Sequence, residues 1–160
     1  MRWTIAGQSP SLFLLGLLIG IWLPDIDLAI PYLPHRSGLT HSVLPGLIVL
    51  FLGYPRLAAG ILTATAIHLS ADMFPVAWRG TAVTYLPLIG GLGAWSMAFL
   101  GLNVLAALLL AFHLLQQPPL TSLPMVATGV LALAYLVLKE WSIPGLVVFA
   151  ACAWLARRTA

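Results

Sequence analysis

Charged side chains are scarce in this sequence of 160 residues. They account for 7% of the chain, whereas 61% of the residues are hydrophobic. A soluble globular domain of average composition has about 25% charged residues. A chain of this length can bury one soluble core, but this one has too few polar side chains to cover it. The composition therefore argues against a soluble domain and predicts an integral membrane protein whose apolar surface faces lipid.

Cysteine is almost absent as well. The single Cys152 can form no disulfide within the chain, and it rules out a structural zinc site built from several thiolates. A metal site in this protein must therefore use histidine and carboxylate ligands.

A stripe of basic residues is also missing, although the formal net charge is +3. Apart from Arg157 and Arg158, the cations stand singly along the chain. Nucleic acid is therefore not an expected partner, and we interpret the cations as anchors at the membrane interface. An N-terminus on the cytoplasmic side places four cations inside and three outside, which favours that orientation in a bacterial inner membrane by a small margin.

Long apolar runs are what the sequence does contain, and runs of about 20 such residues predict membrane-spanning helices. We expect an all-α, polytopic membrane bundle of five to six helices, at roughly residues 10–28, 41–54, 57–74, 92–115, 121–138 and 143–155. No small-x-small cleavage site follows the first run, so we expect it to be a retained helix and not a signal peptide. Residues 76–91 carry Trp78, Arg79, Pro87 and three glycines, and they predict one interfacial or re-entrant segment.

The whole chain is expected to form a single membrane domain, residues 1–160. Its polar residues divide it into a metal-site half, about residues 10–91, and C-terminal helices, about residues 92–156. Between Asp25 and Asp72 lie three of the four acidic residues and three of the four histidines. Each ionisable group at membrane depth costs about 2.5–3.5 kcal/mol, so this cluster predicts a neutralising divalent cation. The candidate metal ligands are Asp25, Asp27, His35, His41, His68 and Asp72.

The order of the helices predicts that these ligands meet. The first two aspartates lie at the end of the first expected helix, and the first two histidines precede or begin the second. His68 and Asp72 end the third helix, where their spacing of four residues places them on one face. Three helices of alternating direction bring all of these ends to one side of the bundle. Imidazole and carboxylate ligands suit zinc best, with manganese or iron as alternatives, and there is room for one or two ions.

Three short motifs carry a resemblance to a known family. They are LPDID at 23–27, HRSGLTHS at 35–42 and HLSADM at 68–73. In this order they resemble the boxes of the inner-membrane metal-dependent hydrolase family, some of whose members are LexA-regulated. The resemblance covers about the first half of the chain, through Pro87, and implies the same six metal ligands. The second box departs from the family pattern because Ser37 and Gly38 stand where a single glycine is usual.

The leading hypothesis is a membrane-embedded, metal-dependent hydrolase that acts on a lipid, or on a lipid-linked ester or phosphate, at the membrane interface. The metal would activate a water molecule, and Asp27 or Asp72 would accept its proton. Arg36 would bind an anionic group of the substrate or pair with an aspartate.

Two alternatives from other classes stay open. The chain could be a non-catalytic small subunit of a larger membrane complex, with a structural metal or polar cluster. It could also be an ion transporter, but transport needs polar groups in both halves of the membrane. Outside the cluster the sequence offers few, such as Asn103 and His113, so this alternative ranks last.

Overall fold

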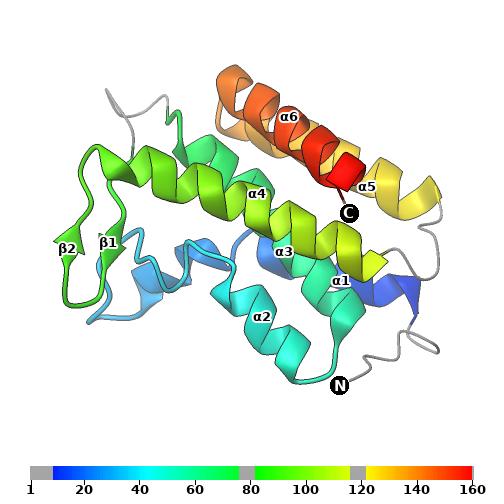
Figure 1. Ribbon diagram of the computed structural model, residues 1–160, viewed down its shortest axis with the longest axis horizontal. Coiled ribbons are helices and arrows are strands. Elements are labelled where there is room, and N and C mark those ends of the chain that lie inside the picture. Colours follow the sequence, from blue (N-terminus) through cyan, green and yellow to red (C-terminus); the bar gives the residue numbers. More distant parts are fainter. Residues whose placement is uncertain (1–8, 76–81, 116–121, 160) are drawn as a thin grey trace.

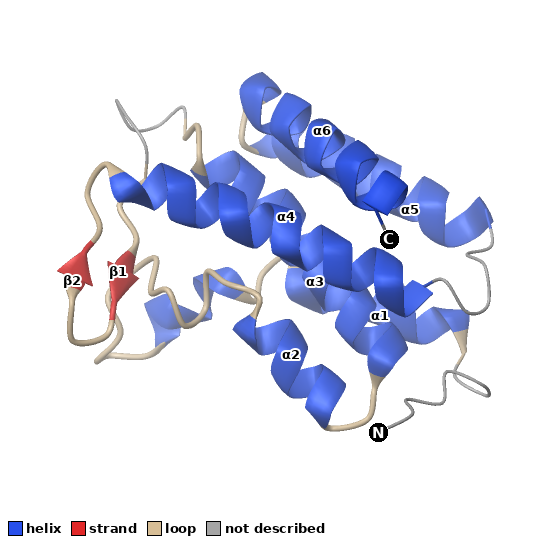
Figure 2. Ribbon diagram, viewed as in Figure 1, coloured by secondary structure: helices blue, strands red, loops and turns tan. Residues whose placement is uncertain are grey.

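The computed structural model describes residues 9–75, 82–115 and 122–159. These residues are mostly helical, and the only strands among them are two of two residues each (Figures 1 and 2). The expected all-α class is therefore confirmed. The elements in chain order are α1 (Pro10–Gly20), the 3-10 helix η1 (Pro24–Ala29), α2 (Leu44–Phe51), α3 (Pro55–Asp72), β1 (Tyr85–Leu86), β2 (Gly90–Gly91), α4 (Trp95–Leu115), α5 (Ser122–Leu133), the π-helix η2 (Ala134–Lys139) and α6 (Ile143–Thr159).

Helix α3 is the centre of the structure, with α1, α2, α4 and α6 packed around it (Figure 1). Every residue from Ala58 to Asp72 is buried. Many of these residues are alanine, threonine or glycine, and such small side chains let neighbouring helices approach on several sides. The last turn of α3 carries His68 and Asp72, so the metal-site residues of this helix are placed by the most enclosed element of the structure.

Helices α1 and α3 touch backbone to backbone. A Cβ atom added to Gly16 would lie 3.0 Å from the Cα of Gly60, and one added to Gly20 would lie 2.7 Å from the Cα of Ile61. Both distances are shorter than ordinary carbon contacts. The two glycines of α1 are four residues apart, which is the small-xxx-small spacing of closely packed membrane helices. This contact fixes the end of α1 against α3 and thereby positions η1.

The first two helices are shorter than the sequence indicated. α1 has 11 residues and α2 has 8, which at a rise of 1.5 Å per residue gives about 16 and about 12 Å. A bilayer core is about 30 Å thick, so neither helix crosses it alone. Thr40 does not begin α2, because its hydroxyl group hydrogen-bonds to Asp27 and the helix starts only at Leu44. The expected ranges of the later four helices agree with α3, α4, α5 with η2, and α6.

One described helix, α4, is long and apolar enough to cross a membrane, with 21 residues and a mean hydropathy of 2.2. Among the described residues, this criterion supports one membrane-spanning helix and not the expected bundle of five to six. Of the expected interfacial segment at 76–91, residues 76–81 lie outside the described residues.

The rest of that segment forms an antiparallel hairpin, in which Tyr85 pairs with Gly91 and Leu86 with Gly90. Strand β1 also holds the loop that follows η1. The amide of Tyr85 donates to the carbonyl of Arg36 (3.0 Å), and the amide of Gly38 donates to the carbonyl of Tyr85 (2.7 Å). The hairpin therefore braces the loop that carries two of the candidate ligands.

Candidate metal centre

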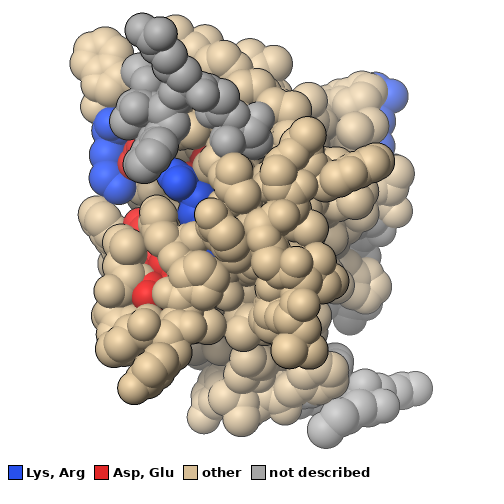
Figure 3. Space-filling view, turned by 90° about the vertical axis from the view of Figure 1, so that its left-hand side faces the viewer, with Lys and Arg blue, Asp and Glu red and all other residues tan. Residues whose placement is uncertain are grey.

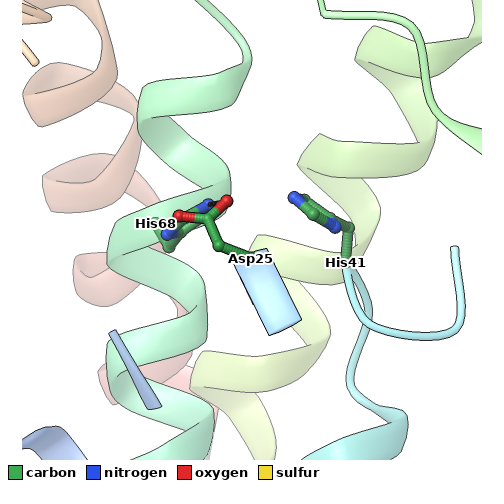
Figure 4. A group of neighbouring side chains, drawn as sticks. All are labelled: Asp25, His41 and His68. Atoms are coloured by element: carbon green, nitrogen blue, oxygen red, sulfur yellow. Dashed lines mark ion pairs between the residues drawn. The ribbon is translucent and has the colours of Figure 1, made fainter. Parts of the chain in front are cut away.

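Four side chains point donor atoms toward one another at the end of α3. Asp25 comes from η1, His41 from the loop before α2, and His68 and Asp72 from α3. His41 Nε2 lies 3.3 Å from Asp72 Oδ2, and His68 Nε2 lies 3.5 Å from the same oxygen and 3.6 Å from Asp25 Oδ1. Donor atoms of Asp25, His41 and His68 all lie within 4.8 Å of one another (Figure 4). The expected meeting of these helix ends is thus observed.

The three distances given above are close to the separation of neighbouring ligands around a zinc ion. At zinc bond lengths of about 2.0–2.1 Å, the ligands of a tetrahedral site are separated by about 3.3–3.5 Å. His41 Nε2 and Asp72 Oδ2 are both buried, and neither has a hydrogen-bond partner among the described residues. Buried polar atoms are rarely left in this way. A cation bound by both atoms would satisfy them.

The other nitrogen of His41 is held by a hydrogen-bonded carboxylate. His41 Nδ1 lies 3.1 Å from the hydroxyl of Thr40 and 3.3 Å from Asp27 Oδ2. That carboxylate oxygen accepts hydrogen bonds of 2.9 Å from both the Thr40 hydroxyl and the Ser37 amide. Because these neighbours accept a proton from Nδ1, the network assigns the proton there and leaves the lone pair of Nε2 free for a metal.

Asp27 contacts His41 on its Nδ1 side, opposite to the nitrogen that faces Asp72, and His35 contacts Asp27. His35 Nδ1 is 3.3 Å from Asp27 Oδ1, and the side chain of Asp27 is buried in η1, beyond the end of α1. Burial raises the pKa of the Asp27 carboxyl, but hydrogen bonds from Ser37, His35 and Thr40 outweigh it and hold that pKa below its usual value. The structure does not bring these two expected ligands to the point where the other four meet, and their binding of an ion stays a prediction.

His68 is oriented by two partners of its own. Its Nδ1 lies 2.9 Å from the carbonyl oxygen of Ile21 and 2.8 Å from the hydroxyl of Tyr135. A carbonyl accepts hydrogen bonds only, so Nδ1 carries the proton and Nε2 is free to bind a metal. Sequence reasoning missed Tyr135, which lies in the C-terminal half of the chain, outside the three motifs.

Arg36 closes one side of the site. Its Nε donates to Asp72 Oδ1 over 3.2 Å, so it pairs with an aspartate, which was one of its two expected roles. Its φ angle of 62° lies in the left-handed region, which costs a residue other than glycine about 1–3 kcal/mol. The hydrogen bond from the Tyr85 amide to the Arg36 carbonyl helps to hold this conformation.

The site opens toward the end of the molecule that carries the hairpin. The side chains of Asp25 and His35 are 29% and 39% exposed, whereas those of His41, His68 and Asp72 are largely buried. In the space-filling view of this end, the visible acidic and basic atoms lie mainly in one area of the face (Figure 3). Asp25 is therefore the most accessible of the four converging residues.

Comparison of the chain with family models, with curated proteins and with solved structures gives no match.

Proposed function

We propose that this chain is a membrane-embedded, metal-dependent hydrolase that cleaves an ester or phosphate bond of a lipid or lipid-linked substrate. The observation that carries the proposal is the set of four converging donors, two of which are buried without a hydrogen-bond partner among the described residues. Two imidazoles and two carboxylates at these separations suit zinc best, with manganese or iron as alternatives. The three motifs that resemble those of the inner-membrane metal-dependent hydrolases contain all four of these donor residues and agree with this proposal.

The outer surface supports a membrane location. Each of the outer helices exposes large apolar side chains, and the following five are more than 60% exposed on α1, α2, α4, α5 and α6 in turn: Leu18, Phe51, Leu102, Val130 and Val147. Apolar surface on this scale is unusual for a soluble monomer and suits contact with lipid. We propose that the helices form the expected bundle of five to six membrane segments, in which α1 and α2 enter the bilayer only part of the way.

Exposed aromatic residues near the helix ends add to this support. Trp22, Trp95 and Trp141 adjoin the ends of α1, α4 and α6 on the side of the metal site, and each is at least 60% exposed. Tyr54 and Trp154 lie toward the opposite ends of α3 and α6 and are at least half exposed. Tryptophan and tyrosine gather at both membrane–water interfaces. We place the metal site near one of these interfaces, in the bacterial inner membrane with the N-terminus in the cytoplasm.

The exposure of each side chain indicates which residues would bind the metal and which one would accept a proton. Asp25, His41, His68 and Asp72 would hold a divalent ion, which would supply a Lewis acid for activating water and polarising the bond to be cleaved. Asp25 is the carboxylate that solvent reaches, so one of its oxygens can bind the metal while the other accepts the proton of the attacking water. The protonated carboxyl then returns this proton to the oxygen that leaves the substrate.

The role expected of Asp27 changes in this proposal. Its carboxylate is buried, and both of its oxygens already have partners, so it cannot reach a substrate. It acts instead by orienting His41. Asp72 is not available as the proton acceptor either. Its Oδ2 would bind the metal, and its Oδ1 accepts a hydrogen bond from Arg36.

The substrate class follows from the surroundings of the opening. Arg36 places a cation beside the metal ligands, which favours a substrate with an anionic group near the bond that is cleaved. A site near the membrane interface, surrounded by apolar helices, is reached most directly by a molecule that is itself dissolved in the bilayer. A phospholipid or a lipid-linked phosphate meets both conditions.

The test combines metal analysis with a hydrolysis assay. The chain is purified in detergent, its metal content is measured, and it is then placed in vesicles that contain phospholipids and lipid-linked phosphates. We expect bound zinc and a hydrolysis rate that disappears in His68→Ala. His113→Ala is the matched control, because this fourth histidine is exposed on α4 away from the cluster.

The outcomes separate the hypotheses. Zinc that copurifies without turnover on any of these substrates would favour a structural metal in a subunit of a larger complex. A preparation that binds none of the three metals, with stability unaffected by His68→Ala, would contradict the metal site itself.

A further inference from the structure

The helix after α5 changes its winding next to the metal site. Residues Ala134–Lys139 form a π-helix, a wider turn that is uncommon and that recurs at functional sites. This segment packs against the central helix α3. Its second residue, Tyr135, is buried, and its ring centroid lies 5.5 Å from that of His68.

The polar end of Tyr135 faces His68 directly. The Tyr135 hydroxyl lies 2.8 Å from His68 Nδ1, the nitrogen that also lies 2.9 Å from the Ile21 carbonyl. The opposite nitrogen of the same ring, Nε2, is the one that faces Asp25 and Asp72. The hydroxyl therefore contacts the ring on the side away from the metal donors.

The ammonium group of Lys139 also contacts the ring of Tyr135. The Lys139 ammonium lies 4.4 Å from the centroid of the Tyr135 ring and 4.6 Å from that of Trp22. These distances are within the range of cation–π attraction. Lys139 also pairs with Glu140 over 3.0 Å. The ring of Tyr135 thus contacts both an imidazole and an ammonium group, and these contacts restrict its rotation.

We infer that Tyr135 is a positioning residue of the metal centre. The Ile21 carbonyl keeps the proton of His68 on Nδ1, and the Tyr135 hydroxyl oxygen accepts from the same N–H and helps to hold the ring in the plane in which Nε2 faces the other donors. Histidine ligands of metals usually have such a partner on their second nitrogen. This inference rests on the proposed metal site and extends it, because the centre then needs a residue from the C-terminal half of the chain.

The experiment removes only the hydroxyl group. Wild type, Tyr135→Phe and the control Tyr54→Phe are purified in detergent, and their zinc affinities are measured by competition with a chelator. Each protein is also loaded with Co²⁺, whose visible absorption bands report the geometry of the ligands. We expect Tyr135→Phe to bind zinc about 10–100-fold more weakly and to shift the cobalt bands. Tyr54 is half exposed at the start of α3, so its variant should match the wild type in both measurements.

The results distinguish this inference from the proposal on which it rests. A wild type that binds neither zinc nor cobalt would contradict the metal site itself. A wild type that binds both, beside a Tyr135→Phe variant with the same zinc affinity and the same cobalt spectrum, would overturn the role of Tyr135 alone.

A second measurement covers the case in which Tyr135→Phe does not fold. The ¹⁵N chemical shifts of His68 in the zinc-loaded wild type report which ring nitrogen carries the proton. Protonation at Nδ1 is expected, and a proton on Nε2 would overturn the inference.

Discussion

His41 Nε2 and Asp72 Oδ2 lie 3.3 Å apart in the interior of the protein, and neither atom has a hydrogen-bond partner among the residues described. One atom comes from a loop and the other from the central helix. The fold therefore holds the two atoms together although they form no hydrogen bond with each other. A metal ion bound by both, as proposed above, would satisfy the two atoms, and the following predictions test this proposal.

Zinc should stabilise the folded chain. Each tenfold rise of free zinc above its dissociation constant adds about 1.4 kcal/mol to the free energy of unfolding. Thermal unfolding of the detergent-solubilised protein, followed by circular dichroism, should show a melting temperature that rises with zinc and falls with chelator. A melting temperature that ignores both would speak against a metal that belongs to the native state.

Asp72→Asn should bind zinc far more weakly than the wild type. The substitution keeps the shape of the side chain but removes the negative charge that lies between the two imidazoles. Loss of a ligand should exceed the effect of about 10–100-fold that is typical of a group that only orients a ligand. Chelator competition measures the change, and the exposed His113→Ala variant should bind as the wild type does. Equal affinities in the two variants would remove Asp72 from the ligand set.

Asp27→Asn should behave differently. Because Asp27 contacts His41 on its Nδ1 side, we expect a loss of zinc affinity of about 10–100-fold. Hydrolysis should return to near the wild-type rate once zinc is saturating, since Asp27 touches no substrate. Hydrolysis rates of the variant, measured over a zinc titration, test this expectation. If saturating zinc restored nothing, Asp27 would be a ligand or the proton acceptor after all.

Gly16→Ala should destabilise the packing of α1 on α3. The added methyl group would collide with the carbonyl of Leu57 and lie 3.0 Å from the Cα of Gly60. Overpacking of this kind costs about 1–3 kcal/mol. The matched control is Gly129→Ala in α5, where the new methyl meets no atom within 4 Å and should stabilise the helix by about 0.5–1 kcal/mol. Comparison of the two melting temperatures tests the contact, and a harmless Gly16→Ala would refute it.

Leu102→Asp tests the membrane location. Leu102 is 68% exposed near the middle of α4, so in water the change would cost little. In a bilayer a carboxylate at the centre of a helix costs about 2.5–3.5 kcal/mol. We expect less protein in the membrane fraction after carbonate washing, whereas Thr159→Asp, at the exposed end of α6, should have no such effect. Equal recovery of both variants in the soluble fraction would contradict a spanning α4.

The sequence predicted the parts of the site that depend on chain order and helix spacing. His68 and Asp72 share a helix face because they are four residues apart, and alternating helices bring Asp25 and His41 to the same end. It could not separate Asp25 from Asp27, since their different directions depend on the 3-10 winding of η1. The sequence also predicted a large apolar surface, but it did not predict how that surface is arranged around the bundle.

Other features depend on contacts between distant residues, which a single sequence does not display. Tyr135 meets His68 only because the chain returns to α3 after two more helices, and nothing near Tyr135 in the sequence marks a π-helix. The glycine contact between α1 and α3 requires knowledge of which helices are neighbours. Thr40 directly precedes the helix expected at 41–54, yet its hydroxyl group donates a hydrogen bond to the buried carboxylate of Asp27 and does not cap that helix.

The 3-10 helix η1 has a consequence for how this protein tolerates change. With three residues per turn, side chains two positions apart point in well separated directions, so Asp25 faces the metal donors while Asp27 lies behind His41. One short turn therefore carries both a ligand and the support of another ligand. Inserting or deleting a single residue between Pro24 and Ala29 would displace both carboxylates at once. Such a change should abolish metal binding, whereas substitution of one carboxylate should only weaken it.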